Sequence, residues 1–154
     1  SSCALGNSFT GLFKLILCFF AKATTCWKTL ASLSSPKGAI PPSTTVFEAN
    51  FGIQKGLVKK NFTEEQANYQ KQEIDRLLLS YSVIDFNQRA AEIAAYIFAR
   101  LSQSDKNKHW RDTFIVATAI AHNYGLATQN KRDMELIGKC LPENSDLFLT
   151  IWKA

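Results

Sequence analysis

Three carboxylates and one amide stand where they could bind a divalent cation. Glu48 follows a connector rich in Pro, Ser and Thr, and Asp112 precedes the apolar run "TFIVATAIA". Asp133 lies five residues after the triplet "LAT", with Asn130 between them. Carboxylates that are brought together repel one another unless a cation or a shared proton lies between them. Because this set is rich in oxygen and contains no histidine, it suits Mg²⁺ or Mn²⁺, ions that polarise phosphoryl oxygens and activate water for phosphodiester hydrolysis.

Each acid also has an ordinary structural explanation when it is taken alone. Glu48 is predicted in the first turn of one helix and Asp112 at the opening of another, where an acid opposes the helix dipole favourably by about 0.3–1 kcal/mol. The metal-site hypothesis therefore depends on the fold bringing the acids together. In a parallel α/β sheet they would meet at the carboxyl ends of the strands, where ligands bind.

The charge balance favours a polyanionic partner. The chain of 154 residues carries a net charge of +5, with a pI near 9.1. The basic residues that flank the acids are Lys106, Lys108, Arg111, Lys131 and Arg132. They could hold the phosphates of RNA, and a solvated basic rim is the alternative. Thr128, which ends the predicted strand, is a further candidate for substrate binding, although a Thr at a strand end also commonly bonds its own backbone.

Composition predicts one globular domain, since 46% of the residues are apolar and 20% are charged. None of the four cysteines forms a Cys-x-x-Cys pair, so neither a zinc site nor a redox motif is predicted and a cytoplasmic location is expected. The stretch "GLFKLILCFFA" at 11–21 is shorter than the roughly 20 apolar residues of a spanning helix. No membrane span is therefore predicted, and a membrane-surface helix at this stretch is a weaker alternative.

The elements that must position these residues alternate between helix and strand. The connector "SSPKGAIPPSTT" at 34–45 disfavours helix and can cap the helix predicted from Thr45. The remaining predictions are a helix over 63–80 with a capping box of Thr63 and Gln66, a β-branched segment at 82–86, a helix capped by Asn87 and ending at Leu101, a loop at 102–109, a helix over 112–123 capped at Gly125, and strands at 126–128 and 147–152. Because parallel strands need helical crossovers, this order predicts an α/β fold with a mostly parallel sheet.

Structural roles are predicted for His122 and Trp110. His122 lies at a predicted helix C-terminus, which favours a dipole-facing or surface role. His109 lies beside Trp110 in the predicted loop. Trp110 is interpreted as a cover for the core, and stacking on an RNA base is the alternative.

The stretch "RDTFIVATAIAHNYGLATQNKRDMELIG" resembles the C-terminal signature of PIN-domain ribonucleases, especially toxins of the VapC type. In that signature an Asp opens a helix of small residues, a His-x-x-Gly-like turn ends it, and Thr-x-Asn-x-x-Asp follows the next strand. The earlier "PPSTTVFEANFGIQKG" is similar to the family's Ser/Thr-rich strand end and Glu-bearing helix. The likeness runs from about residue 39 to about residue 152.

The resemblance implies a three-layer α/β/α sandwich and a Mg²⁺- or Mn²⁺-dependent endoribonuclease. Glu48, Asp112 and Asp133 would be its catalytic acids and metal ligands, with Asn130 as a further ligand and Thr128 at the position of an active-site hydroxyl. The resemblance also implies a cognate antitoxin protein that covers the acidic edge, and it leaves a homodimer open.

The chain departs from the family at its start. Family members begin with a strand that ends in an Asp, the first metal ligand, whereas no Asp or Glu precedes Glu48 here. "ALGNSFTGLF" at 4–13 occupies the expected place, so the first strand is predicted to be divergent or missing. Residues 1–36 are interpreted as a divergent or damaged segment and residues 37–154 as the PIN-like domain. Two functions remain open: a ribonuclease of full or reduced activity, and a catalytically impaired PIN-like module that binds RNA or a protein.

Overall fold

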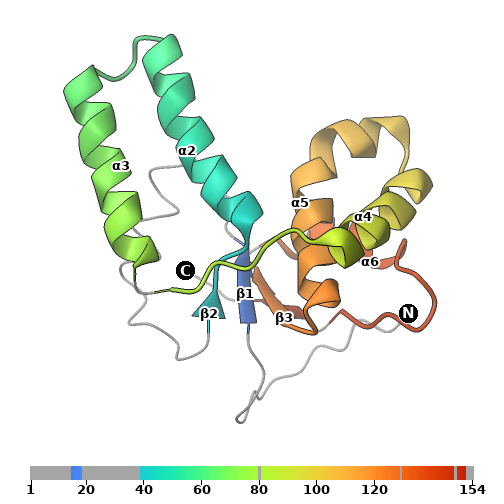
Figure 1. The fold of residues 1–154 in the computed structure, drawn as a ribbon. Coiled ribbons are helices and arrows are strands. Elements are labelled where there is room, and N and C mark those ends of the chain that lie inside the picture. Colours follow the sequence, from blue (N-terminus) through green and yellow to red (C-terminus); the bar gives the residue numbers. More distant parts are fainter. Residues whose placement is uncertain (1–14, 19–38, 80, 129, 148, 152–154) are drawn as a thin grey trace.

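The computed structural model describes residues 15–18, 39–79, 81–128, 130–147 and 149–151. In this part of the chain, short strands are joined by longer helices (Figure 1). The elements in chain order are β1 (Leu15–Cys18), β2 (Ala39–Ile40), α2 (Ser43–Val58), α3 (Glu64–Leu78), α4 (Gln88–Arg100), α5 (Gln103–Ala121), β3 (Gly125–Thr128), α6 (Lys131–Gly138) and β4 (Leu149–Ile151).

The four described strands form one sheet in the order β2-β1-β3-β4, and all neighbouring pairs are parallel. In the register of the central pair, Leu15 of β1 lies opposite Gly125 of β3, and Cys18 lies opposite Thr128. Parallel strands need long crossovers, and the helices α2 to α5 supply one between β2 and β3. The described strands thus run as the alternation of elements in the sequence predicts.

The earliest strand in the described part of the chain is β1. β1 occupies residues 15–18, whereas the expected position at 4–13 falls outside the described residues. The alternative of a membrane-surface helix is wrong for residues 15–18, because they form a strand between β2 and β3. Apolar runs this short do not distinguish strand from buried helix by periodicity. In the described ranges, no helix combines the length and the apolar character that crossing a membrane requires.

Helices α2 and α3 lie side by side and project from the rest of the fold (Figure 1). α2 begins at Ser43, two residues before the predicted start, where the Ser43 amide donates to the Ile84 carbonyl at 2.9 Å. Glu48 therefore lies in the second turn, and the prediction that it sits in the first turn and opposes the helix dipole is wrong. The capping box of Thr63 and Gln66 at the start of α3 is present as predicted.

The predicted loop at 102–109 is wrong, because α5 begins at Gln103. The hydroxyl of Ser102 accepts from the Asp105 amide at 3.1 Å and donates to the Asp105 carboxylate at 2.7 Å. This Ser-x-x-Asp spacing is a helix start signal that the polar composition of the segment obscured. The preceding cap was predicted correctly, since the Asn87 side chain accepts a backbone hydrogen bond of 2.9 Å at the start of α4.

Helix α5 is kinked at His109, whose φ of −118° and ψ of 18° are not helical. The Thr113 hydroxyl donates to the His109 carbonyl at 2.8 Å, a bond to the preceding turn of the kind that bends helices. Asp112 lies in the first turn after this kink, close to its predicted place at a helix start. Gly125 was predicted to cap the end of this helix in the left-handed conformation, but it begins β3. Asn123, with φ of 57°, is the residue that takes up the left-handed conformation after α5.

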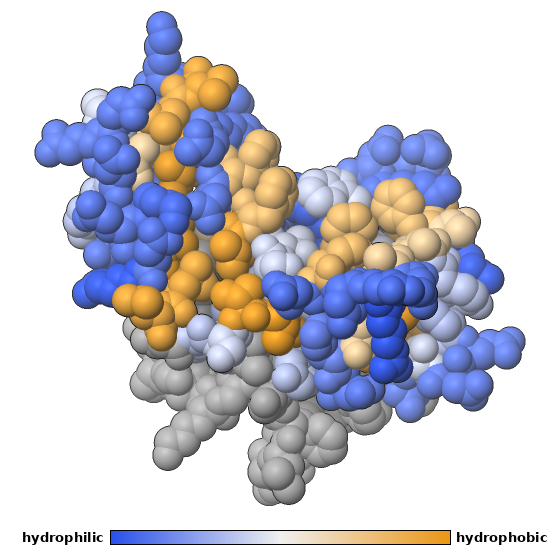
Figure 2. Space-filling model, viewed as in Figure 1, coloured by the Kyte–Doolittle hydropathy of each residue, from blue (hydrophilic) through white to orange (hydrophobic). Residues whose placement is uncertain are grey.

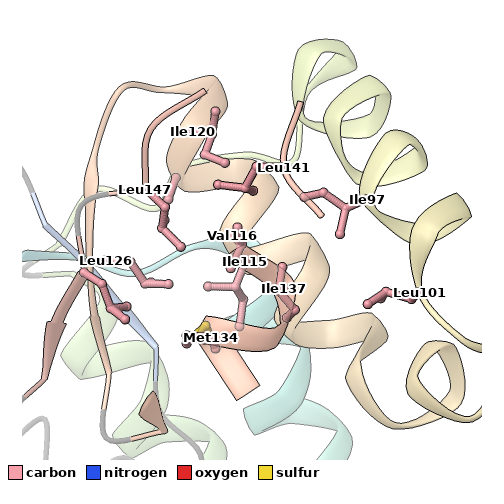
Figure 3. Packing of buried hydrophobic residues seen from close by; sticks show 12 residues of the cluster. Ile97, Leu101, Ile115, Val116, Ile120, Leu126, Met134, Ile137, Leu141 and Leu147 are labelled. Atoms are coloured by element: carbon pink, nitrogen blue, oxygen red, sulfur yellow. The ribbon is translucent and has the colours of Figure 1, made fainter. Parts of the chain in front are cut away.

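The main hydrophobic core lies between α4, α5 and α6 and the strands β3 and β4 (Figure 3). Its fully buried members include Ile97, Ile115, Val116, Leu126, Met134, Ile137, Leu147 and Leu149. Burying one side chain of this size stabilises the fold by about 1.5–3 kcal/mol. α6 was not predicted from the sequence, and its packing through Met134 and Ile137 holds the turn after β3 in place.

Candidate metal site

The predicted acids gather near the carboxyl ends of β1 and β3. Cys18 and Thr128 end these strands side by side, and α6 follows β3 after a short turn. α5 contacts both strands and also α2 and α6. Asp112 of α5 consequently lies close enough to Asp133 of α6 and Glu48 of α2 for their charges to act on it. This edge of a parallel sheet is where ligands bind in α/β proteins.

Asp112 is the most deeply buried of these acids. Its side chain has 0% exposed surface, and neither carboxylate oxygen has a hydrogen-bond partner among the described residues. The pKa of Asp112 is raised to about 8, first by burial and then by the charges of Asp133 and Glu48, while Arg111 acts in the opposite direction. A buried carboxylate without a partner is costly unless a proton or a cation neutralises it. Asp112 thus lies in a place that favours one or the other.

His109 lies between Asp112 and Asp133. The prediction of a cation site without histidine is therefore wrong. Its Nδ1 atom is 3.4 Å from Asp112 Oδ2 and 3.7 Å from Asp133 Oδ2. One ligand atom from each of the three residues lies within 4.8 Å of the others. Nδ1 nevertheless makes no hydrogen bond of good geometry within the described part of the chain. The missed signal is the His-x-x-Asp spacing, which places two side chains on one helix face.

Asn130 and Thr128 shape the turn that presents Asp133. The Asn130 side-chain oxygen accepts from the Asp133 amide at 3.4 Å, and its side-chain amide donates to Asp133 Oδ2. The Asn130 backbone amide in turn donates to the Thr128 hydroxyl at 3.0 Å. Thr128 is fully buried, and its hydroxyl bonds the local backbone. Of its two predicted roles, substrate binding and backbone bonding, this arrangement shows the second. Both residues therefore position Asp133 in this arrangement.

Glu48 lies at the margin of the group. Its Oε1 atom is 3.4 Å from Arg111 Nε, and burial raises the pKa of Glu48 while Arg111 lowers it. Glu48 acts on Asp112 through its charge, but it is not one of the three residues whose ligand atoms converge. Arg111, a predicted RNA contact, is thereby engaged with an acid of the site.

The three convergent residues fit a divalent cation. Two ligands bound to one ion at about 2.1 Å lie about 3.0 Å apart in octahedral geometry and about 3.4 Å apart in tetrahedral geometry. The Nδ1–Oδ2 separations of 3.4 and 3.7 Å match or slightly exceed these values. With Asp112 deprotonated, the charges of Asp112 and Asp133 balance one divalent ion, and the unpartnered oxygens of Asp112 are available to bind it.

Aromatic side chains cover the surface beside Glu48. Phe47 and Phe51 of α2 stack with ring centroids 5.7 Å apart, and Trp110 packs against Phe47 and Phe114. Trp110 is partly buried in this cluster, which agrees with its interpretation as a cover for the core. Phe47 and Phe51 are 47% and 46% exposed, and Figure 2 shows apolar surface along the α2–α3 hairpin. An apolar surface thus adjoins the acidic group.

No protein-family model matches this sequence, and no curated protein matches it either. Solved structures do match its fold. One is DNA-bound VapBC from Salmonella typhimurium, with a TM-score of 0.65 and 18% identity over 92% of this chain and 100% of the other. The fold is PIN-like.

Two further structures agree with this fold. VapBC2 from Rickettsia felis, bound to a DNA fragment from its promoter, has a TM-score of 0.60 and 18% identity over 90% of this chain and 98% of the other. FitAcB from Neisseria gonorrhoeae has a TM-score of 0.56 and 18% identity over 88% of this chain and 96% of the other. Because a PIN-like fold at this identity does not by itself define an activity, the chemistry must be argued from the site.

Proposed function

We propose that this chain is a metal-dependent endoribonuclease of the VapC toxin type that uses Mg²⁺ or Mn²⁺. The observation that carries the proposal is the buried carboxylate of Asp112, which lacks hydrogen-bond partners among the described residues and faces His109 and Asp133. Holding a charged carboxylate in such a place costs stability unless a proton or a cation neutralises it, and a cation would also account for the convergence of His109 and Asp133 on it. Its location at the carboxyl edge of a parallel sheet supports a ligand-binding role.

Each residue of the site would have a separate role. Asp112 and Asp133 would hold the cation, and Asn130 would keep Asp133 in position through its two side-chain hydrogen bonds. When bound, the cation would neutralise charge on phosphate oxygens and activate a water molecule. If Arg111 turned from Glu48 toward a phosphate, Glu48 would lose its ion-pair partner. Its negative charge would then add to the attraction for the cation.

The basic residues around the site support RNA as the substrate. Lys131 and Arg132 are exposed in the first turn of α6, directly beside Asp133. The ion pair of Lys131 with Glu135 spans 3.6 Å at the surface, and such pairs contribute about 0–1 kcal/mol, so a phosphate could displace it. The exposed faces of Phe47 and Phe51 offer stacking surfaces for unpaired bases.

A second function is favoured by the end of β1. This strand ends at Cys18, which pairs with Thr128 at the site, and no acid precedes Glu48 in the chain. One unit charge attracts another at 4 Å by about 4 kcal/mol at an effective dielectric constant near 20, so a missing carboxylate weakens cation binding. The alternative is therefore a catalytically impaired PIN-like module that binds RNA or a protein without cutting.

The proposal extends to partners and architecture. By the resemblance to VapC-type toxins, a cognate antitoxin protein would cover the acidic edge, and the apolar side chains of Phe47 and Phe51 beside that edge suit such a contact. A homodimer, a cytoplasmic location and helices on both faces of the sheet belong to the same proposal.

Incubation of the purified chain with labelled single-stranded RNA and Mn²⁺ tests the proposed function. We expect slow cleavage that EDTA and Asp112→Asn both abolish. The matched control is Asp146→Asn, which changes an exposed acid outside the convergent group and should leave cleavage intact. RNA that is bound and not cut would favour the binding module, and cleavage that survives Asp112→Asn would overturn the site assignment.

A further inference from the structure

We infer that His109 is a metal ligand through Nδ1, and that the site of His109, Asp112 and Asp133 selects a first-row transition ion such as Mn²⁺ or Co²⁺ over Mg²⁺. This inference rests on the metal site of the proposed function and assigns its third ligand. It is carried by the convergence of one nitrogen and two carboxylates from α5 and α6.

The local structure aims the imidazole of His109 into the site. The kink at His109 takes its backbone out of the helical region, and the Thr113 hydroxyl satisfies the carbonyl that the kink displaces. The His109 side chain is 13% exposed, and its Nδ1 atom is buried without a hydrogen-bond partner among the described residues. Buried polar atoms nearly always have partners, so an unpartnered nitrogen beside an unpartnered carboxylate points to a bound ligand.

The charge of the set argues for a cation as that ligand. When a cation has displaced the proton of Asp112, Asp112 and Asp133 together carry two negative charges, and an imidazole bound through Nδ1 adds a third donor without adding charge. Three protein ligands on a divalent ion leave positions open for water and substrate, as in catalytic metal sites. His109 therefore supplies a donor where β1, which ends at Cys18, supplies no carboxylate.

The nitrogen donor determines which ion binds best. Mg²⁺ prefers oxygen ligands and gives up its water reluctantly. Imidazole binds transition ions more strongly, and affinity at a given nitrogen and oxygen site rises from Mn²⁺ to Co²⁺. A site with one imidazole should therefore bind Co²⁺ and Mn²⁺ more tightly than Mg²⁺, by about tenfold or more.

Isothermal titration of the EDTA-treated full chain with Mg²⁺, Mn²⁺ and Co²⁺ measures this preference directly. His109→Asn places an oxygen near the position of Nδ1, so it should reduce the Mn²⁺ and Co²⁺ affinities about tenfold while leaving the Mg²⁺ affinity nearly unchanged. The matched control is His122→Asn. His122 caps the end of α5, where its Nε2 atom lies 2.9 Å from the Asp85 carbonyl, and its replacement should not alter the ion preference.

The visible absorption of bound Co²⁺ is an independent measurement, because its bands respond to the exchange of a nitrogen ligand for oxygen. Circular dichroism of each variant establishes that it is folded. Equal ratios of Mn²⁺ to Mg²⁺ affinity in the wild type and His109→Asn would overturn the inference, as would unchanged Co²⁺ bands. If the affinity ratios were equal but the chain cleaved RNA, this inference would fail and the proposed ribonuclease function would be retained. If the ion preference depended on His109 but RNA was not cleaved, the ribonuclease function would be refuted and this inference supported.

Discussion

Replacing Asp112 with Asn should change how the stability of the metal-free protein depends on pH. The folded-state pKa of Asp112 is raised from 3.8 to about 8, with burial as the largest cause. Between these values the folded protein keeps a proton that the unfolded chain releases, so the free energy of unfolding falls as the pH rises. The stabilising contribution of the protonated acid is complete below pH 3.8 and is lost as the pH approaches 8.

The magnitude follows from the width of this window. Each pH unit lowers the free energy of unfolding by about 1.4 kcal/mol, so the interval from pH 5 to pH 8 removes at most about 4 kcal/mol. For a chain of this length, 1 kcal/mol corresponds to about 2–4 °C in Tm, which makes the largest loss about 8–16 °C. The side-chain amide introduced by Asp112→Asn would resemble the protonated acid in shape, and it does not titrate. The variant should therefore gain stability relative to the wild type as the pH rises.

Thermal unfolding followed by circular dichroism, in EDTA at steps between pH 5 and pH 8, measures this difference. Asp146→Asn removes an exposed carboxylate and should track the wild type at every pH. If the difference in unfolding free energy between Asp112→Asn and the wild type stayed constant within about 0.5 kcal/mol over this range, the reasoning from a buried and unpartnered Asp112 would be refuted.

Two further substitutions test how the turn and the strand end position the site. Asn130→Ala should lower stability by about 1 kcal/mol through loss of the α6 cap, and it should also weaken Mn²⁺ binding because Asp133 loses its amide donor. Asn87→Ala, which removes the α4 cap, should cost similar stability and leave Mn²⁺ binding unchanged; equal Mn²⁺ affinity in both variants would show that Asn130 does not position Asp133. Cys18→Asp should raise the Mg²⁺ affinity measured by titration by about tenfold, because it adds a charge at the strand end beside Thr128. An unchanged Mg²⁺ affinity would place the end of β1 away from the ion.

Local signals in the sequence were reliable where neighbouring residues alone determine the structure. The caps at Thr63 and Asn87 were predicted because each depends on a side chain and a backbone amide three residues apart. The same rule applied to Ser102 and Asn130 would have revealed the first half of α5 and the whole of α6. Of the described helices, only these two stretches were missed, because one is almost entirely polar and the other is too short to show a clear apolar period.

The sequence by itself determined the alternation of helices and strands of a mostly parallel α/β fold, and it showed that no acid precedes Glu48. The tertiary structure decided that Asp112 is fully buried without a hydrogen-bond partner among the described residues, that Glu48 pairs with Arg111, and that His109 stands between Asp112 and Asp133. Caps follow from contacts within a few residues, and the parallel direction of the strands follows from the helical crossovers that join them. Burial and charge interactions act through space between elements that are distant in the sequence, so only the packed fold sets them.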